Sequence, residues 1–264
     1  INASVLGLIF EKINGYKDGS IFTPGFITMY MSRETIRKTV VQKFRKSSKY
    51  KSIKSFEELI DEIDTSKEGR AEANAIINSL KVVDPAVGSG HFLVSVLNEI
   101  IALKSELGVF NYRDGNRVKN YKVEIDNDEL TVFDEEDDEL FKYSASLKDG
   151  KRSISDEKQK LQEALFHEKQ TIIENCLFGV DININSVKIC RLRLWIELLK
   201  NAYYSKESSY SELETLPNID INIKCGNSLV SRFQLNTSLK KALKKKNFSI
   251  DDYREAVKNY QCAK

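Results

Sequence analysis

The chain has few histidines and cysteines, and each shortage narrows the chemistry open to it. Only two histidines occur, His91 and His167, which argues against a histidine-based metal site or catalytic triad. The four cysteines lie far apart and lack metal-binding spacing, so we expect reduced thiols in a cytoplasmic protein. No apolar run reaches the length of a membrane-spanning helix, and no signal peptide is visible.

The charge is nearly balanced, at 41 basic and 39 acidic residues with a net charge of +2. This balance does not by itself indicate a nucleic-acid-binding protein. The length of 264 residues and the 41% hydrophobic content allow one large domain with a sizeable core. Because the first residue is Ile1, we expect the chain to be a piece of a longer protein.

Apolar spacing predicts helices at both ends and a mixed region between them. Helices are expected over 2–14, where Gly15 would end the helix, and after Thr23, which would cap a helix with Pro24 in its first turn. An antiparallel hairpin, with room for a third strand, is expected near 120–143, with Asn127-Asp128 as its turn. The acidic run at 134–139 is interpreted as a solvated turn. Further helices are expected over 56–63, 69–80, 91–107, 152–174, 185–204 and the last residues of the chain.

Three buried strands are expected, at 81–85, 176–181 and 219–225, with helices between them. This alternation predicts a parallel sheet, in which ligands bind beyond the carboxyl ends of the strands. Polar groups stand at those ends: Asp84 with the glycines Gly88 and Gly90, then Asp181, then Asn227. Each has a simpler interpretation as a turn or helix cap, but all three at successive strand ends favour a ligand site.

The residue types suit adenosine with a cationic tail. The two glycines let backbone approach a ligand, and an acid ending the second strand can bind both hydroxyls of a ribose. Asn227 offers a donor and an acceptor for the edge of adenine, and Ile182 could lie against the ring. The loop lacks the third glycine of a dinucleotide fingerprint, and Asp84 would repel a pyrophosphate while attracting an ammonium group. These features favour S-adenosylmethionine over NAD.

Four segments in order resemble the motifs of DNA adenine methyltransferases whose cofactor motifs precede the catalytic one. They are IFTPGFITMYM, DPAVGSGHFL, LFGVDININSVKICRLRLWIELL and NIKCGNSL, and the resemblance covers roughly 2–37, 72–107 and 168–230. The family most resembled is the modification domain of type IIG (type IIS) restriction–modification enzymes. This resemblance implies a partial Rossmann-like α/β methyltransferase fold with N-terminal helices and an inserted β-hairpin.

The resemblance also assigns residues to S-adenosylmethionine. Thr23 and Pro24 would contact its methionine end, and Asp84 with the loop of Pro85, Ala86, Gly88 and Gly90 would cradle it. Asp181 would hold the ribose, and Ile182 would lie beside the adenine. Asn227 and Ser228 would read the adenine edge. His91 fits the family pattern, yet we interpret it as a locally packed residue at the helix start rather than a catalytic one. No metal ligand and no catalytic residue is assigned.

One family feature is missing. The enzymes carry Asn-Pro-Pro-Tyr or Asp-Pro-Pro-Tyr, which holds a flipped base, but the three prolines here, Pro24, Pro85 and Pro217, are never adjacent. The nuclease signature is absent as well, because no proline precedes an aspartate. We therefore expect cofactor binding without methyl transfer by these residues alone. DNA would be bound through the full-length protein and only weakly here, since the basic run LKKALKKK is more typical of a solvated helix face.

The expected organisation has four parts: an N-terminal helical segment at 1–80, a cofactor-binding core at 81–108 and 152–235, an inserted hairpin at 109–151, and a basic helical C-terminal segment at 236–264. Three rival functions stay open. An RNA or protein methyltransferase would share the cofactor, an NAD enzyme would share only adenosine, and a non-catalytic binding module would bind neither.

Overall fold

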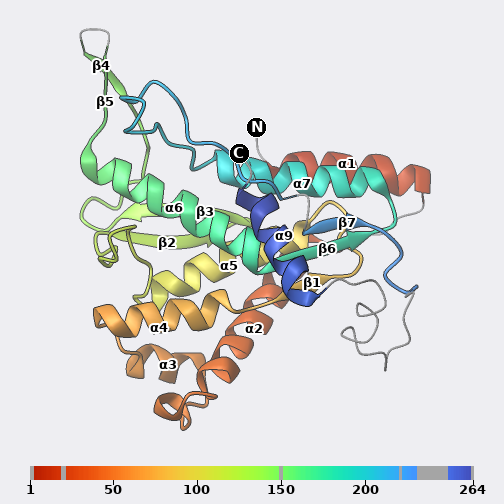
Figure 1. The fold of residues 1–264 in the computed structure, drawn as a ribbon, viewed down its shortest axis with the longest axis horizontal. Helices are drawn as coiled ribbons and strands as arrows, with labels where there is room; N and C mark the ends of the chain where they lie inside the picture. Colours follow the sequence, from red (N-terminus) through yellow and green to blue (C-terminus); the bar gives the residue numbers. More distant parts are fainter. Residues whose placement is uncertain (1–2, 19–21, 149–150, 220–221, 231–248, 263–264) are drawn as a thin grey trace.

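The protein is a mixed α/β structure built around a short parallel sheet (Figure 1). The computed structural model describes residues 3–18, 22–148, 151–219, 222–230 and 249–262. Strands β1 (Val82–Asp84), β6 (Leu177–Asp181) and β7 (Ile223–Cys225) form the sheet in the order β1-β6-β7, with both pairs parallel. These are the three strands that the sequence predicts, and they confirm the parallel sheet.

The helices are α1 (Ala3–Asp18), α2 (Gly25–Phe44), α3 (Phe56–Glu62), α4 (Lys67–Asn78), α5 (His91–Glu106), α6 (Asp156–Asn175), α7 (Ile184–Leu199) and α9 (Ile250–Cys262), with a 3-10 turn at Ser48–Tyr50. Helix α2 packs along α5, and α1 packs along α7 on the other side of the molecule (Figure 1). Among the described residues, no helix is long and apolar enough to span a membrane.

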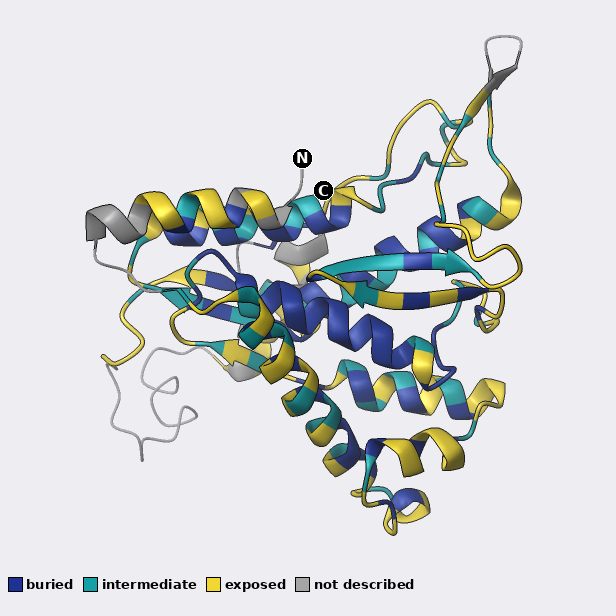
Figure 2. Ribbon diagram, turned by 180° about the vertical axis from the view of Figure 1, so that it is seen from behind, coloured by how far each residue is buried: buried dark blue, intermediate teal, exposed yellow. Residues whose placement is uncertain are grey.

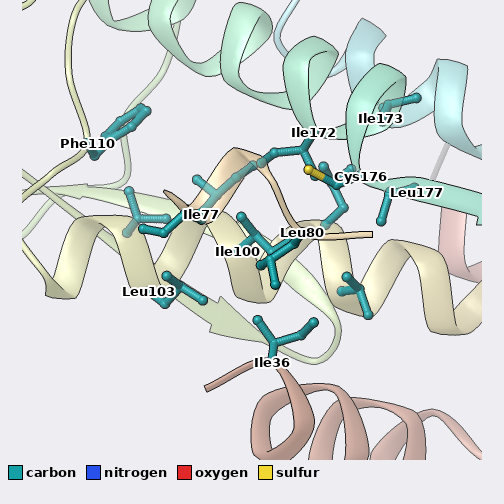
Figure 3. Close-up of a cluster of buried hydrophobic side chains, with 14 of the residues drawn as sticks. Ile36, Ile77, Leu80, Ile100, Leu103, Phe110, Ile172, Ile173, Cys176 and Leu177 are labelled. Carbon is teal, nitrogen blue, oxygen red and sulfur yellow. The ribbon is translucent and has the colours of Figure 1, made fainter. Parts of the chain in front are cut away.

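Helix α5 is the centre of the core, and nearly its whole surface is buried (Figure 2). Ile100 and Leu103 of α5 belong to one buried cluster with Ile77 of α4, Ile172 of α6 and Leu177 of β6, all fully buried (Figure 3). Full burial of side chains of this size contributes roughly 1.5–3 kcal/mol each. The packing fixes α5 against the sheet and so fixes the loop that precedes it.

The region after α5 contains two antiparallel hairpins. Strands β2 (Tyr121–Asp126) and β3 (Glu129–Asp134) are joined by the two-residue turn Asn127-Asp128, whose φ values of 49° and 65° suit these residue types. This confirms the predicted hairpin and its turn. Leu140 adds only an isolated bridge to Phe133, and a second hairpin, β4 (Ser146–Lys148) with β5 (Lys151–Ser153), extends away from the body (Figure 1). Residues 135–139 of the acidic run are exposed, as predicted.

Several predicted helix boundaries were wrong. Helix α7 ends at Leu199 rather than at 204. Helix α1 continues past Gly15 to Asp18, because glycine weakens a helix by about 1 kcal/mol without forbidding it. Thr23 does not cap α2; Pro24 occupies the N-cap position, because its own backbone is extended, with ψ at 142°, and the helix begins only at Gly25. Helix α6 begins at Asp156 rather than 152, because residues 151–153 pair as β5. The basic run at 239–246 lies outside the described residues.

Candidate functional site

The ends of the parallel strands bring the predicted polar residues to one edge of the sheet. Strand β1 ends at Asp84 and β6 at Asp181, and the register places Asp181 beside Cys225 at the end of β7. The Gly226 N–H donates to the Asp181 carbonyl at 2.9 Å, which carries the pairing one residue further. The strand order therefore fulfils the geometric condition on which the predicted ligand site depends.

The loop between β1 and α5 needs glycine at two positions. Gly88 and Gly90 have φ values of +54° and +86°, in the left-handed region. Gly90 precedes the first residue of α5, and a Cβ there would lie 2.7 Å from the Cys190 Sγ of α7. A Cβ on Gly88 would lie 3.2 Å from the ring of Phe22. Gly90 thus allows α7 to approach the loop closely, while Gly88 faces the cavity at the strand ends.

Asp181 connects this loop to the start of α7. Its Oδ2 accepts a hydrogen bond from the Gly88 N–H, and its Oδ1 accepts one from the Asn183 N–H, each at 2.8 Å. The N-cap of α7 is Asn183, whose side chain accepts from the Asn185 N–H at 2.9 Å. Asp181 is therefore not the helix cap. Each carboxylate oxygen retains acceptor capacity beyond these single backbone bonds.

Asp84 is half-buried at the end of β1. Its Oδ1 accepts from the Ala86 N–H at 3.0 Å. Burial raises the pKa of this carboxyl above its usual value, the Ala86 hydrogen bond opposes the shift, and the neighbouring Asp181 carboxylate adds to it. A carboxylate crowded in this way gains from a cationic partner, which would relieve both burial and repulsion.

A cavity of about 770 Å³ lies over this edge. It is lined by Glu11, Phe22, Thr23, Thr28, Asp84, Ala86, Val87, Gly88, Ser89, His91, Phe92, Asp181, Ile182, Asn183 and Ser186. The lining contains three carboxylates, and no lysine or arginine is among these described residues. Its volume falls within the range of roughly 300–1,000 Å³ typical of small-molecule and cofactor sites.

The cavity brings together six of the predicted site residues: Thr23, Asp84, Ala86, Gly88, Asp181 and Ile182. Ile182 is 74% exposed, so its side chain is open to a ligand. Five others do not line it: Pro24, Pro85, Gly90, Asn227 and Ser228. The Asn227 Oδ1 accepts a hydrogen bond from the Leu229 N–H at 2.9 Å. This bond is typical of a turn residue, the simpler of the two interpretations of Asn227.

Two lining residues were not singled out in the sequence analysis: Ser89, which lies within the predicted loop, and Glu11, which is remote from every predicted motif. Glu11 comes from α1 and is 7% exposed, and burial raises the pKa of its carboxyl. The Ser89 hydroxyl donates a short hydrogen bond to its Oε1. The one feature of the sequence that could have indicated Glu11 is that it is a single acid next to an apolar stretch of α1.

His91 is buried at the start of α5. Burial, with Arg193 nearby, lowers the pKa of its imidazole to about 4, so it is neutral near pH 7. Its Nδ1 lies 3.2 Å from the Glu11 carboxylate. In the described part of the chain, no group of three His, Cys, Asp or Glu residues could hold a metal ion.

Two comparisons relate the chain to known proteins. The family model of the MmeI DNA-methyltransferase domain matches residues 60–253. A protein of Methanocaldococcus jannaschii, named as a putative type II restriction enzyme and methyltransferase, is 29% identical over 245 residues. That alignment covers 87% of this chain but only 16% of the relative, so the chain spans a small part of its length. No solved structure matches the chain.

Proposed function

The chain belongs to the family of MmeI DNA-methyltransferase domains, and on this premise we propose that its strand-end cavity binds S-adenosylmethionine. We place it in an adenine-specific DNA methyltransferase of a type IIG restriction–modification enzyme. The family match and the relative named as a type II restriction enzyme and methyltransferase support this proposal. The parallel sheet with packed helices is compatible with the Rossmann-like methyltransferase fold.

The observation that carries the proposal is the charge of the cavity. Glu11, Asp84 and Asp181 line it, with no lysine or arginine among the described lining residues. A phosphate-bearing ligand such as NAD would meet repulsion here, whereas a sulfonium and an ammonium group would be attracted. The charge of the lining therefore favours a cationic ligand such as S-adenosylmethionine over a phosphate-bearing one.

The proposed contacts are those that the family resemblance implies. Asp181 would accept hydrogen bonds from the ribose hydroxyls, with Ile182 against the adenine. Asp84 would face the ammonium, and the backbone from Pro85 to Gly90 would lie along the methionine part. Thr23 and Pro24 would close the methionine end, while Asn227 and Ser228, which stand outside the cavity lining, would reach the adenine edge.

The chemistry that the bound cofactor supplies is a methyl group activated on sulfonium sulfur. These residues of the chain would hold that group in a fixed position and leave its methyl open to an acceptor. The 264 residues contain no adjacent prolines, so the base-holding motif of the family is not among them. We therefore propose that they bind cofactor and that the target adenine is held by other residues of the full-length protein, which would also make the DNA contacts.

Isothermal titration of S-adenosylmethionine and its demethylated product into the protein tests the cofactor assignment, with NAD and ATP as controls. We expect S-adenosylmethionine to bind with micromolar affinity and the phosphate-bearing ligands to bind far more weakly. Equal binding of NAD would contradict the charge argument. A radiolabelled methyl-transfer assay on adenine-containing DNA tests the second part, and robust transfer by these 264 residues would refute it.

A further inference from the structure

A buried polar cluster lies beneath the proposed cofactor loop and joins it to two helices that are remote in sequence. Its members are Glu11 of α1, Ser89 of the loop, His91 of α5 and Arg193 of α7. All four are less than 9% exposed, and Arg193 is completely buried. Polar groups buried this deeply are costly unless they are paired, so the pairing pattern indicates what the cluster does.

Ser89 is held from two sides. Its hydroxyl donates to the Glu11 carboxylate, and Arg193 Nη1 donates at 3.2 Å both to the Ser89 hydroxyl oxygen and to its carbonyl. Ser89 stands between Gly88 and Gly90, the two residues with left-handed backbone. Side-chain contacts to the hydroxyl and to the carbonyl together fix the peptide units around it, and thereby the direction of the loop N–H groups.

Helix α1 also packs directly on the Arg193 guanidinium. A Cβ on Gly7 would lie 2.7 Å from Nη1 and 2.9 Å from Cζ, so the helix approaches as closely as glycine permits. Glu11, one turn further along α1, supplies a carboxylate beside this buried cation and beside the cavity. Nε and Nη2 of Arg193 have no hydrogen-bond partner among the described residues. Nη1 is therefore the nitrogen that joins Arg193 to the loop, through its hydrogen bonds to Ser89.

We propose that Glu11 and Arg193 are positioning residues that clamp Ser89, so that cofactor binding and the seating of α1 on α7 stabilise each other. The inference rests on the proposed function, because it takes the cavity as the cofactor site. The coupling is reciprocal by thermodynamic necessity: if the seated helix strengthens cofactor binding, the cofactor must strengthen helix seating by the same factor. Hydrogen exchange in helix α1 would then respond to cofactor occupancy.

The test compares Ser89→Ala and Glu11→Ala singly and together, with Glu11→Gln as the conservative variant and Lys12→Ala as the matched control. Lys12 is exposed on the same helix, so its removal should change nothing. We expect each single alanine variant to weaken S-adenosylmethionine binding about 10-fold. The double variant should weaken it little further, because both changes break the same contact. Glu11→Gln keeps an acceptor for Ser89 and should retain part of the affinity.

The effect of cofactor on amide hydrogen exchange supplies a readout that a purely structural role would not move. In the wild-type protein, cofactor should slow exchange in residues 5–13 of α1, and Ser89→Ala should abolish that protection. Without cofactor, Ser89→Ala should speed exchange in α1, and Glu11→Ala should speed exchange at Gly88–Gly90. If exchange in α1 ignores both Ser89→Ala and cofactor in folded protein, the clamp is refuted. If wild-type protein does not bind the cofactor, the proposed function fails, while the cofactor-free exchange still decides whether the clamp exists.

Discussion

Asp181 at the end of β6 accepts a hydrogen bond from the backbone N–H of Gly88, at 2.8 Å and across 93 residues of sequence. This bond makes the acid of one strand end a support for the glycine loop of the neighbouring strand. The second carboxylate oxygen holds the Asn183 N–H at the same distance. Because each oxygen still has acceptor capacity, one side chain can shape the loop and bind two ribose hydroxyls.

Asp181→Asn should therefore weaken S-adenosylmethionine binding more than a surface change of the same kind. An asparagine offers one acceptor oxygen, and its amide group would face either the Gly88 or the Asn183 N–H as donor against donor. Hydrogen bonds to a charged group contribute about 1.5–3 kcal/mol, so we expect roughly 10- to 150-fold weaker binding by titration calorimetry. Asp61→Asn, an exposed change on α3, is the control. A folded Asp181→Asn variant with wild-type affinity would remove the ribose assignment.

Gly90→Ala should destabilise the protein for two separable reasons. The left-handed backbone costs an alanine about 1–2 kcal/mol, and its Cβ would meet the Cys190 Sγ at 2.7 Å, an overpacking that typically costs about 1–3 kcal/mol. In a Cys190→Ala background the second cost should disappear and the first should remain. Urea unfolding of the two single variants and the double variant measures this. Strict additivity of the two changes would show that the contact with Cys190 is relieved by other means.

Much of this fold follows from local patterns in the sequence. An apolar run that ends in Asp84 and meets Gly88 predicts a strand, a turn and a helix, and the structure has all three there. Asn127-Asp128 predicts a two-residue turn because both residue types tolerate positive φ, and their φ values are positive. In each case the controlling interactions lie within a few residues of the pattern.

The rest depends on contacts between remote residues. Glu11 enters the cavity only because α1 packs on α7, and no local pattern around residue 11 indicates Ser89 as its partner. Gly90 is a second example. The sequence predicts that its missing side chain makes room for a ligand, but in the structure it makes room for the Cys190 side chain of α7. The start of α2 was misjudged because Thr23 has the right chemistry for a cap but stands one residue too early.

Asn227→Asp should distinguish a turn residue from one that reads adenine. The Oδ1 of Asn227 accepts from the Leu229 N–H, and an aspartate can keep that bond. Aspartate cannot donate to a ring nitrogen of adenine, so only the proposed base contact is lost. One net hydrogen bond of about 0.5–1.5 kcal/mol corresponds to roughly 2- to 13-fold weaker cofactor binding with unchanged stability. Unchanged affinity would leave Asn227 as a turn residue alone.

Ionisation of Asp128, buried in the turn between β2 and β3, should make the free energy of unfolding depend on pH. Asp128 is 7% exposed, its Oδ1 accepts from the Ser95 hydroxyl at 2.7 Å, and its carbonyl accepts from the Asn98 amide at 2.8 Å. Burial raises the pKa of its carboxyl from 3.8 to about 6; the Ser95 bond and the charges of Arg193 and Lys200 oppose this shift, and Glu197 adds to it.

The folded protein thus binds the Asp128 proton more tightly than the unfolded chain does. The neutral form stabilises the fold below pH 4, and this contribution is lost as the pH rises from about 4 to about 6. Asp128→Asn keeps an acceptor for Ser95, tolerates the positive φ and never ionises. Its free energy of unfolding relative to wild type should therefore increase over that window and level off near pH 7, by about 1–3 kcal/mol. Asp137→Asn, exposed in the acidic run, should show no such rise. A pH-independent difference for Asp128→Asn would mean that the Asp128 carboxyl has the same pKa in the folded and unfolded chain, which would refute the shift caused by burial. A difference that falls as the pH rises through about 4 would mean that the charge of Arg193 outweighs burial and holds the carboxylate ionised in the folded protein.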